Sequence, residues 1–387
     1  MTIDLLDGPW YAGDPSADYA WLRAQPGLWF DEANELFAVA RHDDLLEVSR
    51  SPKRFCSGEG FRPKTPPNGS MISQDDPRHT RQRRLVSKGF TPKQVAGMES
   101  HARQIVGELI DAVSEKGECD FVTDIAVPLP MIVIAELLGV RVEDRDRLQH
   151  WSDELIKGAD GHTTDAVIAQ FVDFCEYITE VIEARRAEPR DDLTSILVHA
   201  TIDGAPGFDL DGLVNELLLI LVGGNETTRN VISGAMEALG AHPAQRADLV
   251  ADPSLLTTAA EEFLRWVTPI VTFQRTVVDD TEFAGTPLAA GDKLLLLYGA
   301  ANRDERTFGP TAADFDIRRD PNPHVAFGFG THFCLGASLA RLEIKIMFEE
   351  LLRRVPDIEL AGPVRRTPSA FIRGIAEMPV TFTPERK

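Results

Sequence analysis

Residues 327–336, with the sequence FGFGTHFCLG, place Cys334 between a glycine-rich loop and an expected helix. Gly328 and Gly330 allow the backbone to adopt positive φ angles or to approach a flat ligand closely. Apolar residues then recur at helical spacing, namely Leu335, Leu339, Leu342 and Ile346. This pattern predicts that Cys334 lies in the first turn of a helix that ends before Pro356. A helix N-terminus, neighbouring backbone N–H groups and a metal ion all favour the thiolate, so Cys334 is a candidate ligand for iron.

A buried cysteine after an ordinary glycine-rich turn is the alternative for a short pattern of this kind. The match here is longer, because every fixed position of F-G-x-G-x-H-x-C-x-G is present. The stretch resembles the haem-binding loop of the cytochrome P450 family, in which a cysteine thiolate is the axial ligand of iron and favours O–O cleavage. The resemblance implies haem b as cofactor, Cys334 as the iron ligand, and Phe327, His332 and Gly336 as further cofactor-binding residues.

A second informative segment, residues 209–240, has apolar residues at helical spacing and also on the opposite face. We expect such a helix to be buried and to cross the centre of the protein. Gly223 and Gly224 each cost about 1 kcal/mol relative to alanine in mid-helix, which indicates space for a ligand or, alternatively, close helix packing. The run resembles the oxygen-binding groove of the family, so Glu226 and Thr227 are candidate catalytic residues that relay protons. Thr227 can also hydrogen-bond the Gly223 carbonyl and open the helix locally.

Basic residues outside the cysteine loop form a third group of candidates. His79 and Arg83 would share one face of a helix after Pro77, and taken alone they would be a solvated surface pair. By resemblance, they contact a haem propionate, and Arg275 and His332 match the other family positions for this task. Carboxylates inside a protein need cationic partners, because uncompensated burial costs several kcal/mol per ion.

Glu262 and Arg265 form an E-x-x-R pattern, in which a helix places the two side chains close enough to pair. An isolated pattern of this kind is usually a surface ion pair. Here it lies between the glycine-broken helix and the cysteine loop, which matches the order of motifs in the family. The resemblance implies a structural pair that supports the haem-binding core and takes part in no chemical step.

The charge and the cysteine pattern limit the classes of partner. A formal net charge of −21 argues against nucleic acid or an anionic membrane as a partner. The cysteines at positions 56, 119, 175 and 334 are far apart and form no C-x-x-C pair, so they indicate neither a zinc site nor a disulfide framework.

The N-terminus lacks a secretion signal, and the apolar run 217–222 is far shorter than the ~20 residues of a membrane span. We therefore expect a cytoplasmic protein without a membrane anchor.

The rest of the chain predicts a mainly α fold with small β sheets. Residues 94–200 have the pattern of amphipathic helices, and no internal repeat or domain boundary is visible, so residues 1–387 are expected to form a single P450 domain. Residues 56–76 predict a long irregular loop over the pocket, and by resemblance residues 156–174 form a mobile roof. Strands are expected in a hairpin at 28–41, in the segment 283–298, and in a closing hairpin at 371–382 whose tip reaches the pocket.

The resemblance implies a haem-thiolate monooxygenase that inserts one oxygen atom of O₂ into an unactivated C–H bond. The chain contains no flavin or iron–sulfur motif, so electrons are expected from a ferredoxin and an NAD(P)H-dependent reductase. A peroxide-driven haem peroxygenase is an alternative, although the intact Glu226 and Thr227 pair argues against it. A haem sensor would need an output module, for which the chain leaves no room.

Several stretches, around residues 117–122, 127–131, 223–229 and 324–336, resemble the actinobacterial P450 group that oxidises the cholesterol side-chain terminus. The expected substrate is therefore a steroid such as cholesterol or cholest-4-en-3-one. The pocket segments 58–72, 156–174 and 270–272 resemble that group less closely, so fatty acids and terpenoids are the alternative substrates.

Overall fold

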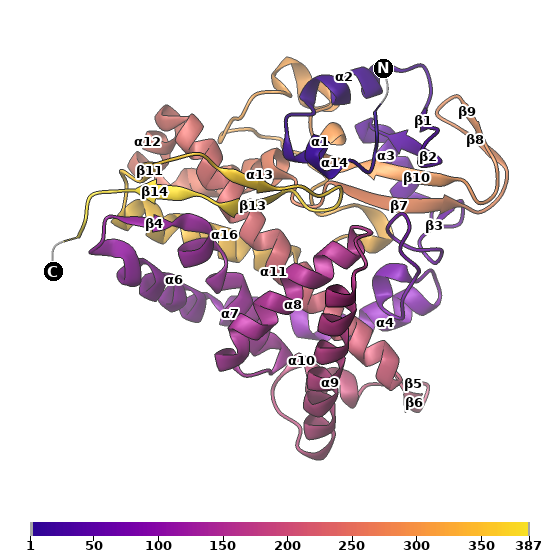
Figure 1. Ribbon diagram of the computed structural model, residues 1–387, viewed down its shortest axis with the longest axis horizontal. Coiled ribbons are helices and arrows are strands. Elements are labelled where there is room, and N and C mark those ends of the chain that lie inside the picture. The colour runs from indigo at the N-terminus through magenta and orange to yellow at the C-terminus, as the bar shows by residue number, and fades with distance from the viewer. Residues whose placement is uncertain (1–2, 386–387) are drawn as a thin grey trace.

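The computed structural model describes residues 3–385 and is dominated by helices (Figure 1). Its α-helices are α1 (Gly8–Ala12), α2 (Ser16–Ala24), α3 (His42–Arg50), α4 (Arg78–Val86), α5 (Pro92–Gly97), α6 (Glu99–Ser114), α7 (Pro128–Leu138), α8 (Arg145–Ala159), α9 (Asp165–Ala187), α10 (Leu193–Val198), α11 (Leu210–Ala241), α12 (Pro243–Ala251), α13 (Leu256–Val267), α14 (Tyr298–Ala301), α15 (Glu305–Phe308) and α16 (Ala337–Arg354). Shorter helical turns are η1 (Met71–Ser73), η2 (Ser87–Phe90), the π-helix η3 (Val122–Ala126), η4 (Val142–Asp144), η5 (Pro253–Leu255), η6 (Gly309–Thr311) and η7 (Gly330–His332). The predicted mainly α fold is confirmed.

The strands are short and belong to several small sheets. They are β1 (Trp29–Asp31), β2 (Leu36–Val39), β3 (Phe55–Cys56), β4 (Glu118–Asp120), β5 (Thr201–Ile202), β6 (Ala205–Pro206), β7 (Thr272–Val277), β8 (Thr281–Phe283), β9 (Thr286–Leu288), β10 (Lys293–Leu297), β11 (Glu359–Leu360), β12 (Arg365–Thr367), β13 (Gly374–Glu377) and β14 (Pro379–Thr381). The largest sheet has the order β1-β2-β10-β7-β3. β1 and β2 form the predicted N-terminal hairpin, and β10 pairs with β2 in parallel.

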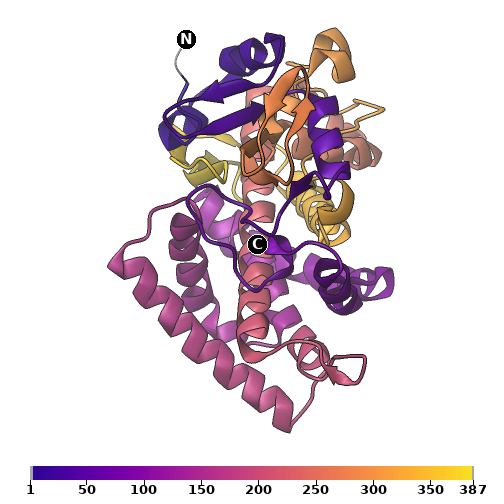
Figure 2. The same cartoon turned by 90° about the vertical axis from the view of Figure 1, so that its right-hand side faces the viewer.

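Helix α11 runs through the middle of the molecule (Figure 2). Its N-terminus is capped by Asp209, whose side chain accepts a hydrogen bond from the Gly212 N–H at 2.8 Å. Helices α6, α7, α13 and α16 contribute to an apolar core on one side, and α4, α8, α9 and α10 contribute to a second core. The predicted buried central helix is therefore confirmed, and it provides the wall on which a site can be built.

Helices α8 and α9 pack against each other and against α11, and α9 lies on the outer surface (Figure 2). Helix α8 ends at Ala159, between Gly158 and Gly161, and α9 ends at Ala187, shortly before Pro189. Residues 57–70 form the expected irregular loop between β3 and η1. Residues of this loop and of the α8–α9 pair line the cavity described below.

The predicted hairpin at 371–382 is wrong. β13 pairs with β12, whereas β14 pairs with β11 and with β4, so the two consecutive strands belong to different sheets. Only Met378 separates them, and one residue is too short to reverse the chain. The segment still reaches the pocket through Phe371 and Ile372, which precede β13.

Candidate active site

A cavity of about 530 Å³ lies between α11 and the cysteine loop. Its walls include residues of the loop before η1, the α8–α9 region, β7 and the segment around Phe371. All but one of the predicted site residues line it, namely His79, Arg83, Thr227, Arg275, Phe327, His332, Cys334 and Gly336. The exception is Glu226. The tertiary structure thus brings together residues from four separate parts of the sequence.

The cysteine loop has the backbone that its glycines predict. Gly328 and Gly330 have φ angles of +69° and +70°, and a Cβ on Gly330 would lie 2.3 Å from the Ser49 carbonyl oxygen. The Cys334 N–H donates to the Phe327 carbonyl at 2.8 Å, which closes the loop. The prediction that Cys334 lies in the first helical turn is wrong, because α16 begins at Ala337. The helix ends at Arg354, before Pro356, as predicted.

The Cys334 side chain is half-buried in the cavity wall, and the removal of its thiol from water raises its pKa. The Gly336 backbone N–H and the guanidinium groups of Arg83 and Arg341 lower the pKa of Cys334, but by less. In the protein alone, burial outweighs the N–H and cationic groups that were expected to favour the thiolate. A metal ion at this sulfur would add the positive charge that stabilises the anion.

Four basic residues converge at the edge of the cavity. The rings of His79 and His332 lie 4.3 Å apart between centroids, and the Nε2 atoms of both are buried without a hydrogen-bond partner in residues 3–385. Burial, followed by Arg275, His79 and Arg83, lowers the pKa of His332 to about 2. Buried polar atoms normally have partners. The cluster can therefore bind an anionic group that accepts from several donors at once.

The two glycines of α11 have different surroundings, one with space for a ligand and the other in close contact with a neighbouring helix. A Cβ on Gly223 would meet open space, whereas a Cβ on Gly224 would lie 2.3 Å from Cδ1 of Ile134 on α7. Gly223 thus leaves room in the cavity, and Gly224 is needed for helix packing. Thr227 Oγ1 donates to the Gly223 carbonyl at 2.7 Å, as predicted. The helix is not interrupted there, however, because α11 remains α-helical to Ala241.

The Glu226 carboxyl group lies outside the cavity lining, on the side of α11 that faces α8. It accepts from Ser152 Oγ at 2.9 Å and from Arg229 Nη2 at 2.7 Å. The same Arg229 nitrogen lies 2.8 Å from Asp153 Oδ1, and the Asp153 side chain is 42% exposed. Burial raises the pKa of Glu226, and Arg229 opposes this shift. A line of charged groups therefore connects the buried Glu226 to solvent.

Comparison with known proteins identifies the family. A profile described as cytochrome P450 matches residues 245–355. The chain is 47% identical to the steroid C26-monooxygenase of Mycolicibacterium smegmatis over 99% of this chain and 96% of that protein, and 45% identical to the steroid C26-monooxygenase of Mycobacterium tuberculosis strain H37Rv over 99% and 97%. The chain belongs to the cytochrome P450 family. Solved structures agree with this assignment, including a P450 of Bacillus megaterium in complex with testosterone. The two structures superpose with a TM-score of 0.89 at 32% identity, over 96% of this P450 and 98% of that chain.

As a member of this family, the P450 is a monooxygenase whose haem iron is held by a cysteine. The donor set fits that cofactor. The Cys334 thiol lines the cavity, and the unpartnered Nε2 atoms of His79 and His332 can serve carboxylate groups of the haem. Family membership also implies an apolar substrate, O₂ and redox partners.

The E-x-x-R pair of this P450 is fully buried rather than on the surface. Arg265 donates to both Glu262 carboxylate oxygens at 2.6 and 2.7 Å. Its remaining donors bind the carbonyl groups of Asn302, Ala312 and Asp314, in the segment that leads to the cysteine loop. Arg319 Nε also donates to Glu262 at 3.2 Å. The pair thus ties α13 to the approach of the cysteine loop.

A buried ion pair that no sequence pattern predicts lies at the roof of the cavity. Arg62, in the loop after β3, lies 3.0 Å from Asp160, which directly follows α8, and their side chains are only 2% and 6% exposed. Arg62 also donates to the carbonyls of Ala159 and Ala370 at 3.3 Å. No sequence pattern connects residues 98 positions apart, so only the fold shows this contact.

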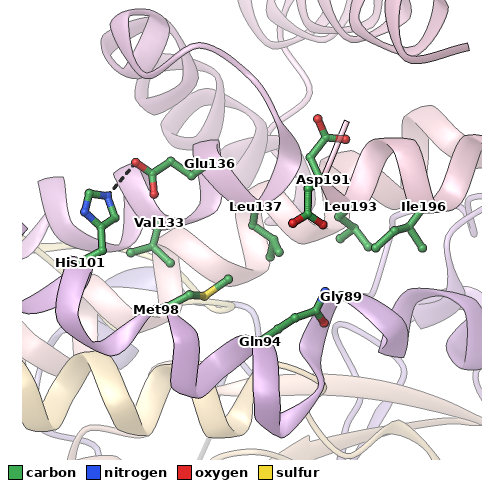
Figure 3. A pocket seen from close by; sticks show the side chains of 11 residues that line it. Gly89, Gln94, Met98, His101, Val133, Glu136, Leu137, Asp191, Leu193 and Ile196 are labelled. Carbon is green, nitrogen blue, oxygen red and sulfur yellow. Dashed lines mark hydrogen bonds and ion pairs between the residues drawn. The ribbon is translucent and has the colours of Figure 1, made fainter. Parts of the chain in front are cut away.

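A second, smaller cavity of about 190 Å³ lies apart from the cysteine loop (Figure 3). It is lined by α6, α7 and α10, and a hydrogen bond of 2.9 Å joins His101 to Glu136 at its edge. None of the predicted site residues lines it.

Among residues 3–385, no helix combines the length and the hydropathy that a membrane span requires.

Proposed function

We propose that this P450 hydroxylates the side-chain terminus of a steroid such as cholesterol or cholest-4-en-3-one. The observation that carries the proposal is 45–47% identity, over nearly the full length, to proteins named steroid C26-monooxygenase. The large cavity above Cys334 supports it, because most of its lining side chains are apolar. We further propose that residues 1–387 act as one domain in the cytoplasm, where free cysteines such as those of this chain are typical.

Cys334 is proposed to bind the haem iron through its thiolate, with Phe327 and Gly336 beside the cofactor. His79, Arg83, Arg275 and His332 are proposed to hold the haem carboxylates, which would give the buried Nε2 atoms their missing partners. When bound, the haem supplies the iron that activates dioxygen with electrons from the redox partners.

Thr227 is proposed to hold the proton needed at the reaction site. Its hydroxyl donates to the Gly223 carbonyl, so its oxygen remains free to accept a proton or a hydrogen bond on the cavity side. Glu226 is proposed to resupply protons from solvent, and its contact with Arg229 and the exposed Asp153 supports such a route. Water that exchanges between the α8 side and the cavity side of α11 would connect the two residues.

The electron donor is proposed to be a ferredoxin that receives electrons from an NAD(P)H-dependent reductase. Three arginines of α4 are exposed, namely Arg78, Arg81 and Arg84, although the chain as a whole carries a net charge of −21. A local basic surface attracts an acidic partner. Arg83 of the same helix donates to the carbonyl of Phe333, next to Cys334, at 2.6 Å, so this surface lies beside the proposed iron ligand.

The substrate proposal is tested by titrating the ferric protein with cholesterol, cholest-4-en-3-one, a fatty acid and a terpenoid, and by analysing products with a surrogate ferredoxin and reductase. We expect a spin-state change with the sterols and a product hydroxylated at the side-chain terminus. Tight binding of the fatty acid or terpenoid without response to either sterol would refute the steroid assignment. A methyl-branched lipid omega-hydroxylase of Mycobacterium bovis, 39% identical over 92% of this chain and 86% of that protein, makes a methyl-branched lipid the second candidate.

The redox proposal is tested by supplying the same sterols with hydrogen peroxide in place of ferredoxin, reductase and NAD(P)H. We expect product only with the complete electron-transfer chain. Equal turnover with peroxide alone would show that the protein is a peroxygenase.

A further inference from the structure

The cavity has a polar end that lies far from Thr227. Asn215 and Thr227 both line the cavity from α11 and are twelve residues apart, which is about 18 Å at a rise of 1.5 Å per residue. Between them, the residues of α11 that line the cavity are Leu218, Leu219, Ile220, Val222, Gly223 and Gly224, which have no polar side-chain atom. Asn68 lines the same cavity from the loop before η1.

The loop that carries Asn68 is packed directly on α11 beside Asn215. A Cβ on Gly69, the residue after Asn68, would lie 3.8 Å from Asn215 Nδ2. Two residues further on, the Met71 N–H donates to Glu216 Oε2 at 2.9 Å. The Met71 hydrogen bond therefore fixes this loop on α11, and because Gly69 lies against Asn215, the neighbouring Asn68 lines the same end of the cavity.

The hydrogen bonds of each asparagine determine which of its amide atoms is free. Asn215 Nδ2 donates to the Asp211 carbonyl at 2.9 Å and to Asp211 Oδ1 at 3.3 Å, and because both atoms are acceptors the NH₂ group must face them. Asn68 Oδ1 accepts from the Ser70 N–H at 3.1 Å and from Ser70 Oγ at 2.6 Å. Among the described residues, Asn215 Oδ1 therefore has no donor and Asn68 Nδ2 has no acceptor. The polar end offers one acceptor and one donor.

We propose that Asn68 and Asn215 recognise the 3β-hydroxyl group of a sterol whose side-chain terminus lies at the Thr227 and Cys334 end of the cavity. This inference rests on the proposed steroid function. A hydroxyl group can donate to Asn215 Oδ1 and accept from Asn68 Nδ2 at the same time. A 3-oxo group can only accept, so it leaves Asn215 Oδ1 unsatisfied beside another oxygen. The sterol is also suited in shape, since its single oxygen and its hydrocarbon tail lie at opposite ends.

The test compares three ligands that differ at carbon 3, which are cholesterol, cholest-4-en-3-one and cholest-5-ene, by spin-state titration of the haem-loaded protein. We expect cholesterol to bind about tenfold more tightly than either analogue, the ratio expected for one hydrogen bond of ordinary net strength. Asn215→Leu should remove this preference, because it deletes the acceptor and keeps a similar volume. Asn68→Asp keeps the acceptor for Ser70 but replaces the donor, and it should reduce the preference.

Leu219→Met serves as the matched control, because it changes an apolar lining residue one turn away with little change in volume. It should alter the affinity for all three ligands equally. Equal binding of the three ligands by the unaltered protein, or an unchanged preference in both asparagine variants, overturns the inference and leaves the steroid assignment intact. A lack of response to all three ligands, with a response to a fatty acid, overturns the steroid assignment and the inference together.

Discussion

Glu226 and Thr227 are consecutive residues of α11, yet only Thr227 lines the cavity, whereas the Glu226 carboxylate lies 2.7 Å from Arg229 on the side of α8. Successive helical residues point about 100° apart, so a pair of neighbours in the sequence serves two different surfaces. This arrangement separates the group at the reaction site from the group that is connected to solvent. Substitutions at the two positions should therefore have different effects.

Thr227→Ala should leave haem and substrate binding intact but divert reducing equivalents to peroxide, because the hydroxyl at the cavity wall is lost. We expect the amount of product per NAD(P)H consumed to fall severalfold, while hydrogen peroxide rises by the corresponding amount. Thr228→Ala removes the neighbouring hydroxyl and is the matched control, with unchanged coupling expected. Unaltered coupling in Thr227→Ala would assign the α11 groove to packing alone.

Glu226→Gln should lower the turnover number by ~10²-fold, the usual contribution of a positioned acid or base, because the amide cannot release a proton. Substrate binding should remain, since the side chain lies outside the cavity and the amide can still bond to Ser152. The measurement is steady-state turnover together with the spin-state titration. Asp153→Asn, at the exposed end of the same line of charges, should have a smaller effect. Normal turnover in Glu226→Gln would make the Glu226–Arg229 pair purely structural.

Cys334→Ser should abolish the red-shifted Soret band of the reduced, CO-bound protein, because a serine hydroxyl cannot replace the thiolate. The three other cysteines provide controls, and Cys56→Ser, Cys119→Ser and Cys175→Ser should each retain the band. The absorption spectrum after reduction under CO is sufficient for the measurement. Retention of the band in Cys334→Ser would identify another residue as the iron ligand.

Asp160→Asn should lower the free energy of unfolding by about 3–5 kcal/mol, because it leaves the buried Arg62 guanidinium without its counter-ion. Asp248→Asn breaks the ion pair with Arg318, whose partners are 49% and 46% exposed, and should cost only about 0–1 kcal/mol. Urea unfolding of the haem-loaded proteins compares the two. Similar losses in both variants would show that the roof pair contributes no more than a surface pair.

Glu216 should make the stability depend on pH. Burial raises its pKa from 4.5 to about 7, and the Met71 N–H only partly opposes this shift. The folded protein therefore binds this proton more tightly than the unfolded chain. This tighter binding contributes roughly 3 kcal/mol to the free energy of unfolding. The contribution is fully present below pH 4.5 and is lost as the pH rises through 7. Glu216→Gln should remove this dependence, so the difference in unfolding free energy between the two proteins should change over pH 4.5–8. A constant difference would contradict the shift.

Local chemistry made much of this site predictable from the sequence. The glycines at 328 and 330 adopt the positive φ angles that their loop requires, and Thr227 bonds to the carbonyl four residues before it. Both features depend on residues close in the chain. The central helix was likewise visible from its periodicity, because apolar residues recur at helical spacing in the first half of α11.

Contacts between distant segments were decided by the tertiary structure. The Arg62–Asp160 pair and the packing of Gly69 against Asn215 join segments that no short pattern connects, and the division of β13 and β14 between two sheets depends on equally distant strands. The rotation of α11 about its axis is set by packing against α7 and α8, and it directs Thr227 to the cavity and Glu226 to Arg229. Residue types and spacing thus determined the cofactor chemistry, whereas long-range packing decided which polar groups face the substrate.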